Sequence, residues 1–417
     1  MAKDRIVGNA VIGQSGGPTA VINQSLVGVI EGLRAGLQAV GAVKRVLGMR
    51  QGVRGLTRDD LVDLDALSAD RLEAIARTPS AALSSTRDKP DAAYGERILD
   101  ACRRHDIRYF FYIGGNDSSD TCRIVSEAAA RAGYEMVCIH VPKTVDNDLV
   151  RNDHTPGFAS AARFVALACR ADALDNASLP GIKINVVMGR HAGFLTAASA
   201  LARRPGQTGS AAADLDGPQL IYVPEVAFDI DRFVGEVDAV YSKRGRCHIA
   251  VSEGIQDANG KAIGASLIKG AQTDAHGNAQ LSGSGALGDL LSDLIKERLT
   301  PAGGKAPRVR ADTFGYLQRC WPDPSPIDQS EARRAGQVGA RLALEGHLAG
   351  SVAIVRAGKG FGGEAYEARF ERVELSDIAA KTKHMPAEFL AGTSDVSPAF
   401  IDYCTPLVGS LPVFERL

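Results

Sequence analysis

Short apolar runs that alternate with longer amphipathic runs constrain the fold of this chain most. The apolar runs have the length and composition of buried strands and cover residues 7–12, 107–113, 136–141, 184–188, 220–223, 247–252, 308–314 and 352–355. The amphipathic runs predict helices over residues 22–33, 158–170, 193–203, 289–299 and 331–344. Strands and helices that alternate in this way form parallel sheets with helices on both faces. We therefore expect an α/β fold whose ligands bind at the carboxyl ends of the strands.

Length, charge and cysteine usage limit the class of protein. A chain of 417 residues is long enough for about two to three domains or one large α/β unit. A formal net charge of -1 argues against nucleic acid as the main partner. No apolar run is long enough to span a membrane, and the first residues lack the apolar core of a signal peptide. The seven cysteines include no Cys-x-x-Cys pair, which favours reduced thiols in a cytoplasmic protein.

Two glycine-containing loops follow predicted strands. Residues 15–19 are Ser-Gly-Gly-Pro-Thr, and residues 114–117 are Gly-Gly-Asn-Asp. Glycines at a strand end let backbone N–H groups approach a phosphate, and the N-terminus of a following helix favours an anion. Carboxylates beside the second loop could hold Mg²⁺ together with diphosphate oxygens. Alternatively, the first loop is a plain turn with Pro18 near the start of a helix, and the second is an Asp or Ser helix cap.

The strongest functional signal is the sequence Pro-Lys-Thr-Val-Asp-Asn-Asp at residues 142–148. It places Lys143 and the carboxylates of Asp146 and Asp148 directly after a predicted buried strand. A carboxylate can accept the proton of an attacking hydroxyl group, and an ammonium group can neutralise charge on a transferring phosphoryl group. The arrangement therefore indicates phosphoryl transfer, although the chain has no Walker A motif. The alternative is an acidic turn with a surface lysine.

Later segments add candidate ligands for a phosphorylated substrate. Arg190 follows a predicted strand, and its planar guanidinium suits bidentate phosphate binding. Glu253 follows another strand and can accept hydrogen bonds from sugar hydroxyls. Arg310 lies in a further predicted strand, and Tyr316 and Arg319 follow that strand. For these last residues, surface charge is the ordinary alternative.

Residues 283–288, Gly-Ser-Gly-Ala-Leu-Gly, match the glycine pattern of dinucleotide-binding loops. That pattern indicates a dinucleotide only when it follows a strand, and here it follows a polar loop. We interpret it as the start of a helix and set aside a nicotinamide cofactor.

Taken together, these segments resemble the phosphofructokinase family, in the family's order and with similar spacing from Gly16 to Arg319. The resemblance implies two doubly wound, Rossmann-like parallel-sheet domains with the active site in the cleft between them. Residues 1–157 with about 320–390 would bind the phosphoryl donor, diphosphate. Residues about 158–319 with 391–417 would bind fructose 6-phosphate.

The resemblance also implies roles for individual residues. Asp146 corresponds to the base that accepts the proton of the sugar 1-hydroxyl. Arg310 matches an arginine that reaches the sugar phosphate from a neighbouring subunit, and Lys183 lies near a second such arginine. The donor-binding positions are Gly16, Arg87, Gly115 and Lys143. The fructose 6-phosphate positions are Thr144, Asp146, Met188, Gly189, Arg190, Glu253, Arg310, Tyr316 and Arg319.

Two positions indicate the donor. ATP-dependent members have glycine where this chain has Asp117 and Lys143, whereas the diphosphate-dependent branch combines an aspartate with a lysine. A carboxylate at position 117 would crowd and repel the α-phosphate of a nucleotide, and the ammonium group of Lys143 would bind diphosphate oxygens. The usual first Mg²⁺-contacting aspartate of the family is Asn116 here. The expected metal ligands are therefore Asn116 and Asp117, the latter directly or through water.

The resemblance therefore predicts a diphosphate-dependent member of the family that uses Mg²⁺ and phosphorylates fructose 6-phosphate reversibly at its 1-hydroxyl. The expected catalytic residues are Asp146, Lys143 and Asp117. A homodimer or a homotetramer is expected, with neither nucleic acid nor a membrane as partner. An ATP-dependent member and a catalytically silent subunit that binds sugar phosphate stay open as alternatives.

Overall fold

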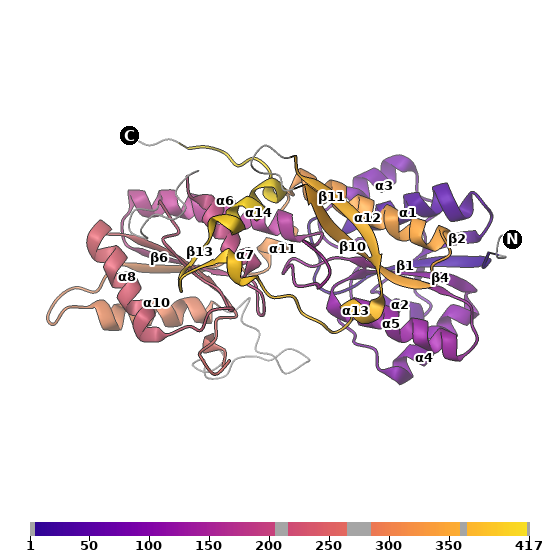
Figure 1. Ribbon diagram of the computed structural model, residues 1–417, viewed down its shortest axis with the longest axis horizontal. Coiled ribbons are helices and arrows are strands. Elements are labelled where there is room, and N and C mark those ends of the chain that lie inside the picture. The colour runs from indigo at the N-terminus through magenta and orange to yellow at the C-terminus, as the bar shows by residue number, and fades with distance from the viewer. Residues whose placement is uncertain (1–4, 205–215, 265–284, 359–364, 415–417) are drawn as a thin grey trace. The chain divides into compact units, whose positions relative to one another are not determined.

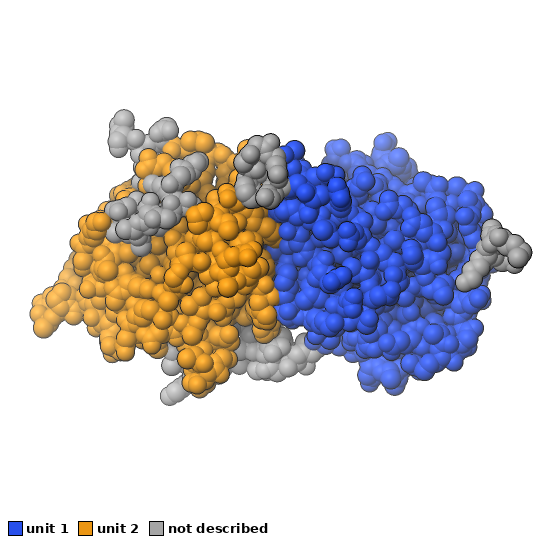
Figure 2. Space-filling model, viewed as in Figure 1, with its two compact units in different colours: residues 1–160, 319–383 blue, residues 161–318, 384–417 orange. Residues whose placement is uncertain are grey.

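The computed structural model describes residues 5–204, 216–264, 285–358 and 365–414 (Figure 1). The chain divides into two compact units, which Figure 2 distinguishes by colour. Unit 1 comprises Met1–Ser160 and Arg319–Lys383, and unit 2 comprises Ala161–Gln318 and His384–Leu417. The expected domain bounds lie within three residues of the first two crossings and seven residues after the third. The ligand assigned to each domain stays a prediction. Residues 283 and 284 of the dinucleotide-like glycine pattern lie outside the described residues.

Unit 1 contains a seven-stranded sheet in the order β11-β10-β5-β4-β1-β2-β3. Its strands are β1 (Gly8–Gln14), β2 (Val43–Met49), β3 (Leu61–Asp63), β4 (Ile107–Gly114), β5 (Val137–Pro142), β10 (Ala349–Gly358) and β11 (Glu367–Val373). The five central strands run parallel, as expected, but β3 and β11 pair antiparallel with β2 and β10. The expected parallel sheet therefore forms the centre, and each edge adds one antiparallel strand that the sequence did not indicate. Antiparallel neighbours need no crossover helix, so the alternation of strands with long helices does not reveal them.

Helices cover both faces of this sheet because successive side chains of each strand point to opposite faces. Ile12, Phe111 and Ile139 belong to one buried core, which they share with α1 (Ile22–Leu33) and α12 (Pro326–Leu344). Their chain neighbours Val11, Phe110 and Cys138 belong to the second core, with α4 (Ala92–Arg104) and α5 (Asn116–Arg131). The shorter helices of unit 1 are α2 (Val53–Thr57), α3 (Ala69–Ala76) and α13 (Leu375–Ile378).

Helices α1 and α12 approach each other closely (Figure 1). A Cβ atom added to Gly28 would lie 2.0 Å from the carbonyl oxygen of Arg333. One added to Gly336 would lie 2.2 Å from the carbonyl oxygen of Ser25. Both contacts are far shorter than van der Waals distance, so only glycine permits this packing.

Unit 2 contains a four-stranded, fully parallel sheet in the order β7-β8-β6-β9. Its strands are β6 (Ile182–Val187), β7 (Leu220–Tyr222), β8 (Cys247–Ser252) and β9 (Val309–Thr313). One face packs in a core that includes Ile184 together with residues of α8 (Ile230–Arg244) and α10 (Ala286–Leu299). The next residue, Asn185, faces the other way and donates to Asp172 in α6 (Phe158–Ser178).

The remaining elements are short, apart from α14 (Pro398–Val408). The helix expected over residues 193–203 is divided into α7 (Phe194–Ala197) and a 3-10 helix (Ala198–Ala202). Helix α11 spans Leu317–Cys320, and a small hairpin joins β12 (Leu390–Ala391) to β13 (Asp395–Val396). No helix among the described residues is both long enough and apolar enough to cross a membrane.

Strand order explains where the polar loops gather. In the first sheet, β1 lies between β2 and β4, so the chain leaves β1 on one side and returns on the other. In the second sheet, β6 lies between β8 and β9 in the same way. Such reversals of strand order open a crevice at the carboxyl ends of the strands, where ligands of α/β proteins bind. The predicted doubly wound α/β fold is confirmed.

Candidate active site

The loop after β1 is fastened to the segment that carries Arg87. Gly16 has a φ of 78°, and its N–H donates to the carbonyl oxygen of Thr86 at 2.9 Å. The hydroxyl of Ser85 donates back to the carbonyl oxygen of Gly16 at 2.6 Å. Helix α1 begins only at Ile22, so Pro18 does not occupy the first helical position, and anion binding by this loop stays a prediction.

Lys143 lies buried at the end of β5, directly beneath this loop. Its Nζ donates to the carbonyl oxygen of Gly17 at 2.8 Å and lies 3.1 Å from where a Cβ atom of Gly16 would be. A Cβ atom on Gly17 would lie 2.9 Å from Cζ of Arg319. The two glycines therefore allow an ammonium and a guanidinium group to approach the same stretch of backbone.

The charge of Lys143 is unfavourable in this environment. Burial lowers the pKa of Lys143 from 10.5 to about 7, and repulsion from Arg319 and Arg87 adds to the effect, while Asp146 and Asp148 oppose it. A bound anion would reverse the balance, because opposite charge favours the protonated amine. Lys143 and Arg319, with Arg87 near enough to repel the amine, form a cationic site suited to phosphate oxygens.

The second glycine loop joins β4 to α5. Gly115 is the N-cap of this helix, and no side chain caps it, so the Asp or Ser cap alternative is wrong. The carbonyl oxygen of Gly114 accepts a hydrogen bond from the N–H of Lys143 at 2.9 Å. It also lies 2.9 Å from Nε2 of His140, a buried residue that the sequence analysis missed. The glycine loop and the start of the lysine loop are thus held together.

The expected metal ligands lie in the first turn of α5. Nδ2 of Asn116 donates to Oδ2 of Asp148 at 3.2 Å, and its buried Oδ1 has no hydrogen-bond partner among the residues described. Asp117 is exposed and forms an ion pair with Lys89 at 3.1 Å, a second residue that the sequence analysis missed. In the described part of the chain, no group of three or more His, Cys, Asp or Glu residues could hold a metal ion. The oxygen donors present suit an ion such as Mg²⁺ that takes most of its ligands from phosphate and water.

The loop that carries Asp146 is anchored at its start. The N–H of Thr144 donates to the carbonyl oxygen of Pro156 at 3.2 Å, and the hydroxyl of Thr155 donates to the carbonyl oxygen of Thr144 at 2.9 Å. The N–H of Asp146 donates to the hydroxyl oxygen of Thr144 at 3.2 Å. These bonds fix the backbone from which the proposed base projects.

In unit 2, the sugar-phosphate candidates lie at the ends of β6, β8 and β9. The N–H of Met188 donates to Oε1 of Gln318 at 3.1 Å, next to the half-exposed Tyr316. Gly189 has a φ of 135°, and its N–H lies 3.5 Å from Oε1 of the buried Glu253. A Cβ atom on Gly254 would lie 2.1 Å from the carbonyl oxygen of Arg190, so glycine lets this loop pass close to Glu253.

Two other basic candidates of unit 2 have acidic partners within the chain. Arg310 pairs with Asp175 at 2.5 Å and donates to the carbonyl oxygen of Leu179 at 3.1 Å. Lys183 is buried and pairs with Asp172 at 3.3 Å and with Asp312. Arg310 in β9 thus pairs with α6, and Lys183 in β6 pairs with both α6 and β9. The expected role of Arg310 in a neighbouring subunit stays a prediction.

The two units divide the candidates unevenly. Unit 1 holds Gly16, Arg87, Gly115, Asn116, Asp117, Lys143, Thr144, Asp146 and Arg319. Unit 2 holds Met188, Gly189, Arg190, Glu253, Arg310 and Tyr316. Arg319, expected in the fructose 6-phosphate domain, belongs instead with Lys143, because the chain returns to unit 1 at that residue. Position in the sequence gave no signal for this grouping.

Comparison with known proteins identifies similar chains along nearly the whole length. The family model described as phosphofructokinase matches residues 9–343. A pyrophosphate--fructose 6-phosphate 1-phosphotransferase of Rhodospirillum rubrum is 50% identical over 98% of this chain and 96% of its own length. An ATP-dependent 6-phosphofructokinase of Amycolatopsis methanolica is 31% identical over 78% of this chain and 67% of its own. The crystal structure of a pyrophosphate-dependent phosphofructokinase from Nitrosospira multiformis superposes with a TM-score of 0.81 at 33% identity, covering 98% of this chain and 94% of that one.

Proposed function

Because the chain belongs to the phosphofructokinase family, we propose that it transfers a phosphoryl group from diphosphate to the 1-hydroxyl of fructose 6-phosphate. The products are fructose 1,6-bisphosphate and phosphate. The family predicted from the sequence is confirmed, and the diphosphate-dependent activity predicted with it agrees with the names of relatives at 50%, 39%, 38% and 37% identity. Since a phosphoanhydride is exchanged for a phosphate ester without a nucleotide, the reaction should run in both directions.

The buried position of Lys143 is the observation that carries the proposal. Its amine is enclosed beneath Gly16 and Gly17, with Arg319 alongside, so the cationic site is compact and tied to backbone. Such a site suits a small, highly charged anion. Asp117, paired with Lys89 in the first turn of α5, would add a negative charge where a nucleotide would carry its α-phosphate.

The side chains described above would divide the chemistry among them. Asp146 would accept the proton of the sugar 1-hydroxyl as that oxygen attacks the nearer phosphorus atom. Lys143 and Arg319 would stabilise the charge on the transferring group and on the leaving phosphate. Arg190 and Glu253 would orient fructose 6-phosphate through its phosphate and its hydroxyls.

Members of the phosphofructokinase family generally use a divalent metal ion, and we propose Mg²⁺ for this chain. The buried Oδ1 of Asn116 and the carboxylate of Asp117 would hold it. The ion would neutralise charge on the diphosphate oxygens when bound.

Initial rates with diphosphate and with ATP, at matched free Mg²⁺ and saturating fructose 6-phosphate, test the proposed donor. We expect turnover with diphosphate and little or none with ATP. Efficient use of ATP would overturn the donor assignment. Binding of fructose 6-phosphate without turnover under either donor would instead favour the silent regulatory subunit.

We also propose that the chain acts in the cytoplasm as a homodimer or homotetramer. Arg310 would then reach the sugar phosphate of the adjacent subunit, after release from Asp175. Light scattering on the purified protein measures the oligomer, and a monomer with full activity would exclude this role for Arg310.

A further inference from the structure

The catalytic loop, defined here as residues 144–148, contains a buried residue between its two carboxylates. Asn147 is fully buried and has a φ of 58°, in the left-handed region that asparagine tolerates better than most residues. Its Oδ1 accepts a hydrogen bond from Nζ of Lys383 at 3.2 Å. Asp146 and Asp148 flank this residue, so the position of Asn147 determines where both carboxylates project.

Lys383 binds the catalytic loop at two places and ties it to the following segment. Its Nζ also donates to the carbonyl oxygens of Asn152 and Asp153, each at 2.9 Å. Its backbone N–H donates to the carbonyl oxygen of Asp148 at 2.7 Å. One lysine, more than 200 residues away in sequence, therefore connects the middle and the end of the loop to residues 152–153.

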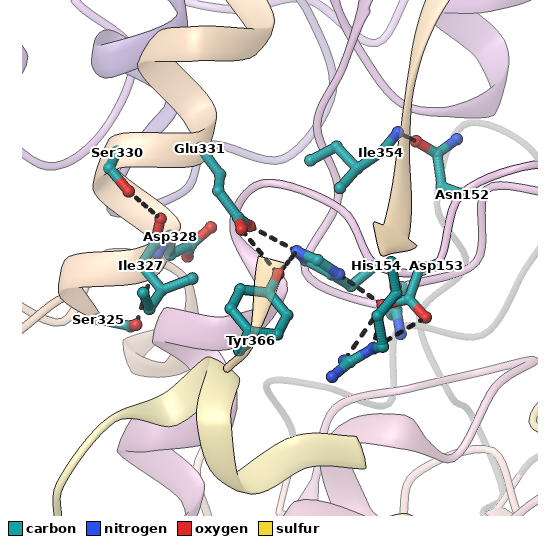
Figure 3. A network of polar contacts seen from close by, with 12 residues as sticks. Asn152, Asp153, His154, Ser325, Ile327, Asp328, Ser330, Glu331, Ile354 and Tyr366 are labelled. Carbon is teal, nitrogen blue, oxygen red and sulfur yellow. Dashed lines mark hydrogen bonds and ion pairs between the residues drawn. The ribbon is translucent and has the colours of Figure 1, made fainter. Parts of the chain in front are cut away.

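The segment that Lys383 holds is itself fixed to the rest of unit 1. Oδ1 of Asn152 accepts from the N–H of Ile354 in β10 at 3.0 Å. His154 lies between two carboxylates, with Nδ1 2.7 Å from Oδ2 of Asp153 and Nε2 2.5 Å from Oε2 of Glu331 in α12 (Figure 3). The hydroxyl of Tyr366 donates to the other oxygen of Glu331 at 2.6 Å (Figure 3). The anchor of the loop is therefore a network built from a strand, a helix and two loops.

We propose that Lys383 is a positioning residue of the reaction, which holds Asn147 and thereby sets the place of Asp146 without contacting substrate. The proposal rests on the proposed function only for the role of Asp146 as base. A conformation such as that of Asn147 persists when its surroundings hold it, and the three oxygen contacts of the Lys383 amine supply that restraint. Residues of this kind act on turnover because small displacements of a reacting group are costly.

The first test compares Lys383→Met with Lys381→Met, a matched control at an exposed lysine two residues earlier. We expect kcat of Lys383→Met to fall by about 10- to 100-fold. The KM values for fructose 6-phosphate and diphosphate should change by less than about threefold, because no substrate contact is removed. Lys381→Met should match the unmodified protein. An unchanged kcat in Lys383→Met, or a rise confined to KM, would overturn the proposal.

The second test removes the other partner. Asn147→Gly deletes the side chain, and glycine adopts a φ of 58° without steric cost. We expect kcat to fall about as much as in Lys383→Met, and the double variant to lose little more, since both changes break one restraint. Independent, additive losses would show that Lys383 does not act through Asn147. If Lys383→Met fails to fold, Asn147→Gly alone carries the test.

Hydrogen exchange separates this inference from the proposed function. Without any substrate, amides of residues 144–149 should exchange faster in Lys383→Met and Asn147→Gly than in Lys381→Met. Equal exchange in all three variants would overturn the positioning role. A protein that turns over neither donor would refute the proposed function, and the exchange result would still decide whether Lys383 holds the loop.

Discussion

Single residues of the proposed donor site take their chemistry from the groups around them, and Lys143 is the clearest case. Burial and neighbouring arginines lower the pKa of Lys143 to about 7. Between about pH 7 and the ordinary value of 10.5, the amine is therefore largely neutral in the folded protein. Because an anion favours the charged form, ligand binding in this range must be accompanied by proton uptake.

Diphosphate binding at pH 8 should therefore take up protons. Titration calorimetry in buffers of different ionisation enthalpy measures the number, and Lys143→Met should take up fewer than the unmodified protein. Protons that diphosphate itself takes up or releases contribute equally to both measurements, so the comparison cancels them. Equal uptake by the two proteins would contradict the assignment of Lys143 to the diphosphate site.

Asp146 makes a separate prediction about chemistry. Asp146→Asn should lower kcat by about 10²–10⁴-fold, because an amide cannot accept the proton of the sugar hydroxyl. Binding of fructose 6-phosphate, measured by calorimetry, should change far less. Near-normal turnover in a correctly folded variant would show that another group is the base.

At the scale of elements, the packing of α1 on α12 depends on two glycines. Gly336→Ala should destabilise the protein by about 1–3 kcal/mol, because its Cβ would meet backbone at 2.2 Å and the helices would have to separate. Gly235→Ala in α8 is the matched control, since nothing lies within 4 Å of its Cβ position. That change should stabilise by about 0.5–1 kcal/mol through helix propensity. Urea unfolding measures both, and equal effects would contradict the packing argument.

The contact between α12 and residues 152–155 makes the stability of unit 1 depend on pH. Burial alone would lower the pKa of His154, but hydrogen bonds and charge from Asp153 and Glu331 raise it from 6.5 to about 9. The other titratable or charged groups of this network include Tyr366, Arg356, Asp328 and Lys383. Because this pKa is raised, the stabilisation that protonated His154 gives to the folded protein is complete below about pH 6.5 and is lost as the pH rises through about 9.

The difference in free energy of unfolding between the unmodified protein and His154→Gln should consequently be larger at pH 6 than at pH 9.5. Lys143 and Lys383 have lowered pKa values in both proteins. Their effects on the pH dependence of stability, opposite in sign to that of His154, therefore cancel in this difference. Urea denaturation at the two values measures it. A difference that stays constant would mean that the charge of His154 does not stabilise the fold.

At the scale of the whole molecule, the chain crosses between the units after Ser160, Gln318 and Lys383. Unit 1 is therefore discontinuous: α12 and β10 come from its second segment, and β10 pairs with β5. Removal of that segment would expose the face of α1 and an unpaired edge of β5. The last crossing also follows directly on Lys383, which makes that residue the end of unit 1.

A chain that stops at residue 318 should accordingly aggregate instead of unfolding cooperatively. A chain of residues 5–160 joined by a short Gly-Ser linker to residues 319–383 should unfold in one transition, because its sheet is complete. The linker can be short, since the N–H of Ser325 donates to the hydroxyl oxygen of Ser160 at 3.1 Å. Circular dichroism in urea distinguishes the outcomes, and a cooperative 1–318 fragment would refute the argument.

Strands β4, β5 and β8 were predicted correctly from nearly continuous apolar runs, and β9 was predicted correctly although it contains Arg310 and Asp312. β11 alternates exposed with partly buried residues, including charged ones such as Arg369, so its sequence lacks an apolar run. The loops around Gly16, Lys143 and Gly189 were found because glycines, charged residues or both directly follow a predicted strand. Lys89, His140, His154 and Lys383 carry no such local signal, and only their partners in space reveal them.

By itself, the sequence determined that this chain forms α/β layers, that polar loops follow its buried strands, and that it belongs to its family. Each of these conclusions depends on short segments whose residues are close together along the chain. Only the tertiary structure decided that Arg319 approaches Gly17, that Asp117 meets Lys89, and that Lys383 holds Asn147. Those pairs are set by strand order and by the return of the chain to unit 1. Such contacts form between groups that are far apart in the sequence, so no local sequence pattern indicates them.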